Sequence, residues 1–224
     1  MIKRVPEKTC LVNLIQSLIA LEVGTSVDIA RSLNEREMPP KCILAACEAA
    51  MMEISELYDS GEYFIASLIM AGEIMNRVIK LVSPRIEARA RGHYKGRVAI
   101  GTVRGEIHSL GKNIAGALLT AYGFDVKDLG VDVPASRYVE CVRDWQPDVV
   151  GLSVLLSSCF HSLEDTVSAL LEFRGTSSSP AVFISGAQVT PALKDYWGAD
   201  YYAPTVFDTV RLCESLARSR RRVA

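Results

Sequence analysis

RVAIGTV, at residues 97–103, is a short apolar run bounded by glycine, which is typical of a buried β-strand. Similar runs follow at residues 124–129, 148–154 and 182–185. Segments with helical spacing of apolar residues lie between and after them, at residues 110–122, 134–145, 160–173 and 206–217. Strands that alternate with amphipathic helices predict a parallel sheet covered on both faces. We therefore expect a doubly wound, parallel, five-stranded sheet in this part of the chain, of which these runs form four strands.

The first ninety or so residues show only helical spacing of apolar side chains. The expected helices cover residues 11–21, 26–33, 43–57 and 64–86, and Gly24 is expected to end the first of them. Four helices with short links pack most simply as an antiparallel bundle. We therefore expect an α/β fold class with two domains, a four-helix bundle over residues 1–91 and the sheet domain over residues 92–224.

The composition of the chain limits the classes of protein to which it can belong. Hydrophobic residues make up 49% of the 224 residues, enough for a core, so a disordered chain is excluded. The 25 basic and 26 acidic side chains give a net charge of -1, which argues against nucleic-acid and membrane partners. No apolar run reaches the roughly 20 residues of a membrane span, and no signal peptide is recognised. The six cysteines form no Cys-x-x-Cys pair, so reduced thiols and a cytoplasmic location are expected.

Ligands bind beyond the carboxyl ends of parallel strands, so the loops after Val103, Val154 and Ser185 are the first candidates for a site. In the first of these loops, His108 lies two residues after Glu106. Imidazole is a common metal ligand, and a carboxylate on its other nitrogen fixes its tautomer. With a single histidine, a cofactor that brings its own metal fits better than a cage of protein ligands. The alternative for this loop is a solvated surface segment.

The second and third loops are built from small residues. Residues 151–158 alternate hydroxyl and apolar side chains, and Ser153 could offer one hydrogen bond within an apolar slot. Residues 184–190 include Gly186, and small residues let a backbone approach a ligand closely. Each of these loops by itself could equally be an ordinary strand end.

Taken in order, the three loops carry Glu106-x-His108-x-x-Gly111, Ser153-x-Leu155 and Ser185-Gly186. This series resembles the Asp-x-His-x-x-Gly, Ser-x-Leu and Gly-Gly motifs of the cobalamin-binding module. That module is shared by methionine synthase, the cobalamin-dependent mutases and the corrinoid proteins of methyltransferase systems. Residues 58–64, YDSGEYF, resemble the helical cap that precedes the module in methionine synthase and in the small corrinoid proteins. The resemblance implies a Rossmann-like, flavodoxin-like fold for the second domain.

The resemblance also implies roles for individual residues. Cobalamin binds base-off in this family, so His108 would be the lower axial cobalt ligand, Glu106 would hold the far ring nitrogen and Gly111 would allow close approach. Phe64 would cover the upper face of the cobalt, although bundle core is an equal alternative for it. The remaining residues implied to bind the cofactor, with Ser153 bonded to the benzimidazole, are Ser109, Ser153, Leu155, Ser157, Ser185, Gly186, Ala187, Tyr202 and Ala203. Two positions depart from the family pattern, because Glu106 replaces the usual Asp and Ser185 replaces the first Gly of Gly-Gly.

Chain length narrows the function that the resemblance implies. A mutase barrel of about 250 residues does not fit beside the module, nor do the further domains of methionine synthase, and no DNA-binding region is recognised. We therefore expect a corrinoid methyl carrier that contains no catalytic residue of its own. It would take a methyl group from a donor-specific methyltransferase. The favoured methyltransferase is an O-demethylase, whose donor is a methoxylated aromatic, and methanol and methylamine are the other candidate donors. A second methyltransferase would pass the methyl to tetrahydrofolate, and a reductive activase is a further expected partner. The alternative is a cobalamin-binding sensor or storage protein without methyl transfer.

Overall fold

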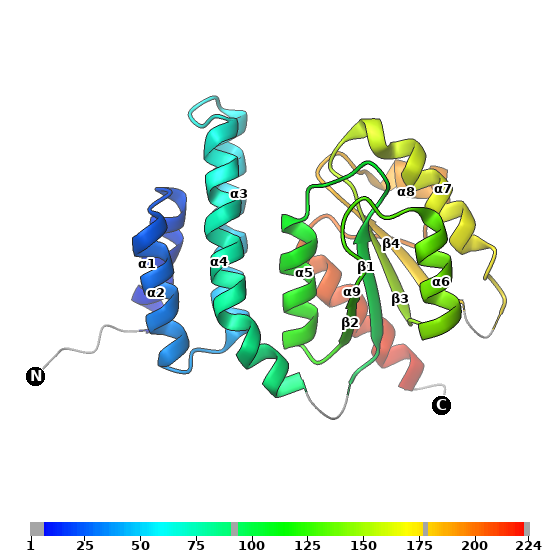
Figure 1. Cartoon of the computed structure of the whole chain (residues 1–224), viewed down its shortest axis with the longest axis horizontal. Coiled ribbons are helices and arrows are strands. Elements are labelled where there is room, and N and C mark those ends of the chain that lie inside the picture. The colour runs from blue at the N-terminus through cyan, green and yellow to red at the C-terminus, as the bar shows by residue number, and fades with distance from the viewer. Residues whose placement is uncertain (1–6, 91–93, 177–178, 222–224) are drawn as a thin grey trace, which may run out of the picture. The chain divides into compact units, whose positions relative to one another are not determined.

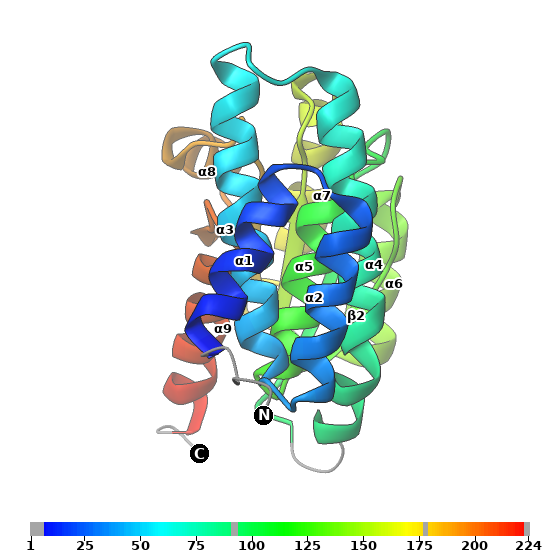
Figure 2. The same cartoon turned by 90° about the vertical axis from the view of Figure 1, so that its left-hand side faces the viewer.

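The N-terminal part of the chain is helical in this computed structural model, which describes residues 7–90, 94–176 and 179–221 (Figure 1). Its helices are α1 (Glu7–Ile19), α2 (Val23–Glu35), α3 (Pro40–Asp59) and α4 (Ile65–Ala90). Figure 2 shows α1 and α2 in front of α3 and α4. The chain divides into two compact units between Arg89 and Ala90, so these helices form a unit of their own, the helical unit.

Apolar stripes and short polar contacts hold the helical unit together. The fully buried side chains include Leu14, Leu18 and Ile54, and the Ser26 hydroxyl donates to the Ser17 hydroxyl at 3.0 Å between α1 and α2. The prediction that Gly24 ends the first helix is wrong. Gly24 lies in the first turn of α2, and the chain turns earlier, at residues 20–22, where a left-handed backbone interrupts the helical hydrogen bonds.

The second unit, the α/β unit, contains a five-stranded sheet in the order β2-β1-β3-β4-β5, and each neighbouring pair is parallel. Its strands are β1 (Arg97–Thr102), β2 (Asp125–Asp128), β3 (Val149–Ser153), β4 (Ala181–Ser185) and β5 (Tyr201–Tyr202). Its helices are α5 (Leu110–Ala121), α6 (Ala135–Trp145), a short 3-10 turn (Ser157–Cys159), α7 (Phe160–Leu171), α8 (Pro191–Trp197) and α9 (Val206–Arg221).

Helices cover both faces of the sheet. Figure 1 shows α5 and α9 on one side and α6 and α7 on the other. The core beneath α6, α7 and α8 includes Tyr138, Val150, Leu163 and Trp197, all buried. The predicted architecture, a four-helix unit followed by a doubly wound parallel sheet, is confirmed.

Two further features of the chain are its cysteines and an ion pair between a buried lysine and a half-exposed aspartate. All six cysteines are free thiols, of which Cys10 and Cys42 are half-buried and the other four are buried. The Lys112 side chain is only 3% exposed, and its ammonium nitrogen lies 2.5 Å from a carboxylate oxygen of Asp128. Among the described residues, every helix is too short or too polar to cross a membrane.

Candidate functional site

The strand register brings the three predicted loops to one edge of the sheet. Thr102 at the end of β1 pairs with Ser153 at the end of β3, which in turn pairs with Ser185 at the end of β4. The chain leaves β1 and β3 toward opposite faces, into α5 and α7 (Figure 1). This is the topological switch point of the sheet, the place where open α/β sheets bind their ligands. We call it the carboxyl edge.

Glu106 and His108 form the most specific contact at the carboxyl edge. The Glu106 side chain is fully buried, whereas the His108 side chain is 48% exposed. Oε1 of Glu106 lies 2.5 Å from Nδ1 of His108 and accepts the backbone N–H of His108 at 2.9 Å. The extra methylene of Glu106 therefore does not prevent a direct contact with the ring. With a proton on Nδ1, the imidazole presents an unprotonated Nε2, which is the state that a metal requires.

The other carboxylate oxygen of Glu106 binds the second loop. Oε2 accepts the backbone N–H groups of Leu155 at 2.7 Å and of Leu156 at 2.9 Å. Burial by itself raises the pKa of the Glu106 carboxyl, but the hydrogen bonds from backbone N–H groups and from the His108 ring outweigh it and lower the pKa below its ordinary value. Glu106 is thus held as a carboxylate that fastens the loop after β1 to the loop after β3.

The backbone around Glu106 is fixed by the loop that follows β2, which the sequence analysis did not identify. The side chain of Asp132 accepts the backbone N–H of Gly105 at 2.6 Å. The backbone N–H of Asp132 donates to the Glu106 carbonyl at 2.9 Å and to the Thr102 hydroxyl at 3.0 Å. The Thr102 hydroxyl also donates to that carbonyl. The only sequence signal for this contact is that the Asp132 loop follows a strand and so reaches the same edge.

The second loop places its predicted residues beside the Glu106–His108 contact. Ser153 is half-buried at the end of β3, and Leu155 and Ser157 are exposed just beyond it. The backbone of Leu155 is joined to Glu106, as described above. The loop therefore presents an apolar side chain and two hydroxyls along the carboxyl edge.

The third loop lies directly against the second. The backbone N–H of Val154 donates to the Ser185 carbonyl at 3.0 Å. Gly186 has a φ of 148°, and a Cβ added there would collide with the Val154 carbonyl oxygen. Ser185 still belongs to regular strand β4, so its Cβ is accommodated where the family motif has glycine. Ala187 follows and is exposed. The second position of this motif therefore requires glycine, whereas the first does not.

The remaining predicted residues of the α/β unit flank these loops. Ser109 precedes α5, and its hydroxyl is 3.4 Å from the side-chain amide of Asn113. A Cβ added at Gly111 would meet open space, so nothing in the chain crowds this position. Tyr202 is half-buried at the end of β5, and the buried Ala203 donates its backbone N–H to the Ile184 carbonyl at 3.0 Å. All of them lie at or next to the carboxyl ends of the strands.

Phe64 belongs to the helical unit, where it immediately precedes α4 and is 72% exposed. It is therefore not bundle core. The turn that carries it is anchored, because the Tyr63 hydroxyl donates to the Ile19 carbonyl at 2.5 Å. Two further apolar side chains on α4, Ile69 and Met70, are also exposed.

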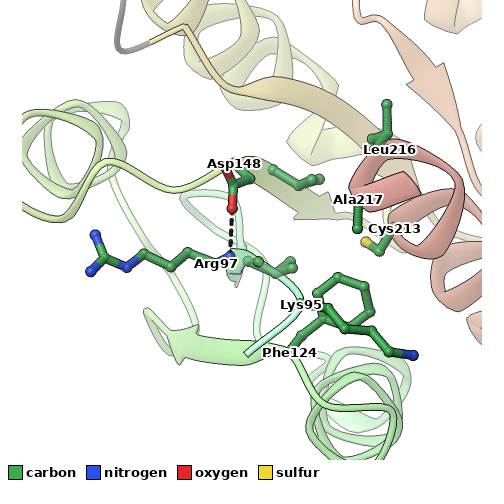
Figure 3. Close-up of a pocket in the computed structure, with 10 residues that line it drawn as sticks. Lys95, Arg97, Phe124, Asp148, Cys213, Leu216 and Ala217 are labelled. Atoms are coloured by element: carbon green, nitrogen blue, oxygen red, sulfur yellow. Dashed lines mark hydrogen bonds between the residues drawn. The ribbon is translucent and has the colours of Figure 1, made fainter. Parts of the chain in front are cut away.

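A pocket of about 260 Å³ opens at the opposite, amino edge of the sheet (Figure 3). Arg97 donates its backbone N–H to Asp148 at 2.7 Å there, and its guanidinium points away from the pocket in Figure 3. Burial raises the pKa of the nearby Cys213 thiol to about 12, so this thiol is unreactive. The pocket contains none of the residues predicted for the site.

Comparison with known proteins identifies the family. Residues 96–211 match the family described as "B12 binding domain", and residues 11–82 match a second family with the same description. The chain belongs to the B12-binding family. It is 36% identical to the trimethylamine corrinoid protein of Methanosarcina barkeri over 77% of this chain and 79% of that protein.

Two solved structures extend the comparison with the B12-binding family. The monomethylamine corrinoid protein of Methanosarcina barkeri shares the fold, with a TM-score of 0.77, 20% identity, and coverage of 92% of this chain and 98% of that one. A cobalamin-binding protein from Desulfitobacterium hafniense is 30% identical, with a TM-score of 0.57 and the same coverage of both chains. The predicted cofactor, a corrinoid of the cobalamin type, is confirmed by these matches.

The residues at the carboxyl edge fit such a cofactor. A corrinoid brings its own metal within its own macrocycle, so the protein would need to supply only one neutral donor. His108 is half-exposed and has its Nδ1 engaged, and the space over Gly111 is open. The surrounding exposed side chains, Ile107 and Leu155, suit the apolar rim of a macrocycle.

Proposed function

We propose that this B12-binding chain is a corrinoid methyl carrier that holds its cofactor base-off through His108. The observation that carries the proposal is the Glu106–His108 contact at the carboxyl edge, with the carboxylate buried and the ring half-exposed. In this arrangement Glu106 keeps the proton on Nδ1 and leaves Nε2 to the metal. When bound, the corrinoid supplies a cobalt that accepts and releases a methyl group.

The other predicted residues receive roles that agree with their positions. Ser153 would bond the displaced benzimidazole, and the small residues Gly186 and Ala187 would line the slot for the nucleotide tail. The position of Gly186 supports this, because without a side chain it presents only backbone beside the Val154 carbonyl. Phe64, which the helical unit leaves exposed, would shield the upper face of the cofactor from water.

The methyl donor would be recognised by the methyltransferase that loads the carrier, not by this chain. Similarity to a protein named for trimethylamine favours a methylated amine as the donor over a methoxylated aromatic, the O-demethylase substrate expected first from the sequence. We propose a donor-specific methyltransferase and a tetrahydrofolate methyltransferase as partners, with a reductive activase that restores the reduced cofactor. We propose that this methyl transfer takes place in the cytoplasm, because the free thiols of the chain suit a reducing compartment.

Ligation by His108 is tested by reconstituting the protein with hydroxocobalamin and recording absorption spectra and electron paramagnetic resonance of the cobalt(II) state. Histidine labelled with the heavy nitrogen isotope should change the axial nitrogen splitting from a triplet to a doublet. His108→Ala should lose this signature. His161→Ala is the matched control, because His161 is 83% exposed and also lies within 4 Å of two carboxylates, at 3.9 and 3.8 Å. Labelling without effect on the splitting would disprove the ligand assignment.

Methyl transfer is tested with the loaded protein and candidate methyltransferases. Conversion of trimethylamine or of a methoxylated aromatic, with stoichiometric methylation of tetrahydrofolate or of a thiol, supports the carrier. Tight cobalamin binding without transfer to or from any methyltransferase supports the alternative, a sensor or storage protein.

A further inference from the structure

Asp132 has an uncommon backbone conformation at the carboxyl edge. Its φ is 54°, in the left-handed region that residues other than glycine rarely adopt. It lies in the loop between β2 and α6, outside all three cofactor motifs. Strain of this kind persists only where the surrounding contacts impose it, and it gathers at functional sites.

The contacts of Asp132 converge on the two residues just before Ile107 and His108. Its Oδ1 accepts the Gly105 N–H at 2.6 Å, and its own N–H donates to the Glu106 carbonyl at 2.9 Å. The left-handed φ allows side chain and backbone N–H to reach neighbouring peptide groups of the same loop. Gly105 can adopt its φ of 85° because it has no side chain to restrict its backbone.

These contacts are not needed to join the two loops. Strands β1 and β2 are already paired up to Ile100 and Asp128, and Val103 forms a further bridge with Val133. What the Asp132 contacts add is a fixed orientation of the two peptides on either side, Arg104–Gly105 through the Gly105 N–H and Glu106–Ile107 through the Glu106 carbonyl. A rotation of these two peptides would swing the Glu106 carboxylate away from Nδ1 of His108 and away from the second loop.

We infer that Asp132 is a positioning residue for the cobalt ligand: by fixing the peptides that flank Gly105 and Glu106 it aims the carboxylate that sets the tautomer of His108. It acts through Glu106, whose carboxylate contacts the His108 ring. The inference rests on the proposed role of His108, but the tautomer it controls is a property of the protein alone.

Three variants separate the functions of the side chain. Asp132→Gly keeps the left-handed backbone and removes the acceptor, whereas Asp132→Asn keeps both the acceptor and a residue that tolerates this conformation. Asp200→Ala is the matched control at the amino edge, because the Asp200 carboxylate likewise accepts a backbone N–H, that of Val182 at 2.8 Å. Unfolding curves of all variants report their stabilities.

The first readout is nitrogen NMR of the histidine rings in cofactor-free protein, assigned with His108→Ala. Wild type should show one tautomer, with the proton on Nδ1 of His108. Asp132→Gly should show a mixture, Asp132→Asn should restore the single tautomer, and Asp200→Ala should leave it unchanged. A single wild-type tautomer in folded Asp132→Gly overturns the inference. If Asp132→Gly does not fold, Asp132→Glu decides in its place, because the longer side chain moves the acceptor away from the Gly105 N–H.

The second readout is the affinity for hydroxocobalamin. Asp132→Gly should weaken binding by about 10-fold to 100-fold, the usual effect of losing a residue that supports a metal ligand. An affinity equal to that of wild type overturns the inference. If wild-type protein shows no histidine nitrogen on cobalt while its ring tautomer still responds to Asp132→Gly, the proposed function fails and the positioning of His108 stands.

Discussion

Glu106→Gln is the substitution that tests the site most directly, because it keeps the shape of the side chain and removes one acceptor. Each carboxylate oxygen of Glu106 faces two donors, His108 Nδ1 and N–H on one side and the N–H groups of Leu155 and Leu156 on the other. An amide has one accepting oxygen, and its NH2 group can only donate. Whichever way the amide turns, NH2 faces a pair of donors.

The imidazole offers the less costly escape. Suppose that the amide oxygen still accepts the N–H groups of Leu155 and Leu156. The NH2 group can then donate a hydrogen bond to Nδ1, provided that the His108 proton moves from Nδ1 to Nε2. That proton then occupies Nε2, the atom that we propose binds the metal. A charge-assisted hydrogen bond contributes about 1.5–3 kcal/mol, and every 1.4 kcal/mol is about tenfold in affinity. We therefore expect Glu106→Gln to weaken hydroxocobalamin binding by about 10-fold to 100-fold.

The assay is spectrophotometric titration of the cofactor-free protein with hydroxocobalamin. Glu106→Asp, which restores the usual family residue and keeps two acceptors, should bind more tightly than Glu106→Gln. Glu140→Gln is the control, since Glu140 forms an exposed ion pair with Arg137 on α6. Wild-type affinity in Glu106→Gln, together with a proton still on Nδ1 of His108, would refute the reasoning.

Three further changes have defined outcomes. Gly186→Ala should cost about 2–4 kcal/mol of unfolding free energy in urea, because its Cβ collides with the Val154 carbonyl; a cost below about 0.5 kcal/mol would contradict this. The Glu106 carboxylate, with its pKa below the ordinary 4.5, stabilises the fold above that pH, and this contribution is lost as the pH falls through the lower folded pKa. Urea titrations at acidic pH should therefore show a steeper loss for wild type than for Glu106→Gln, and parallel curves would exclude it. Asp128→Ala should destabilise more than Lys112→Met, by about 1–2 kcal/mol, because it leaves the buried ammonium without its carboxylate; thermal melts showing the reverse order would contradict this.

The alternation of strands and helices was predictable because each long element carries its own apolar period. The predicted segment 110–122 corresponds to α5, which ends at Ala121, and 97–103 corresponds to β1, which ends at Thr102. Helix α8, at Pro191–Trp197, was not predicted, since seven residues are too few to show a period. Gly24 misled for another reason: tertiary packing tolerates glycine in the first turn of a helix.

The candidate site was predictable only in part. Glu106 and His108 are only two residues apart in sequence, so their contact leaves a signal in the spacing. The backbone N–H groups of Leu155 and Leu156 leave none, because every residue except proline carries one. Asp132 comes from a loop about thirty residues away, and its contact depends on strand order and on a left-handed backbone. Neither property can be read from a single sequence.

The distribution of thiols offers a route to measurement that needs no mutation. Cys10 and Cys42, the half-buried thiols, both lie in the helical unit, while the α/β unit holds only the buried Cys141, Cys159 and Cys213. A thiol-reactive fluorophore should therefore label the helical unit alone. Because corrinoids absorb visible light, they quench nearby dyes. The emission of the labelled protein should then fall when a corrinoid binds within quenching distance of the label, so it would report cofactor binding in real time.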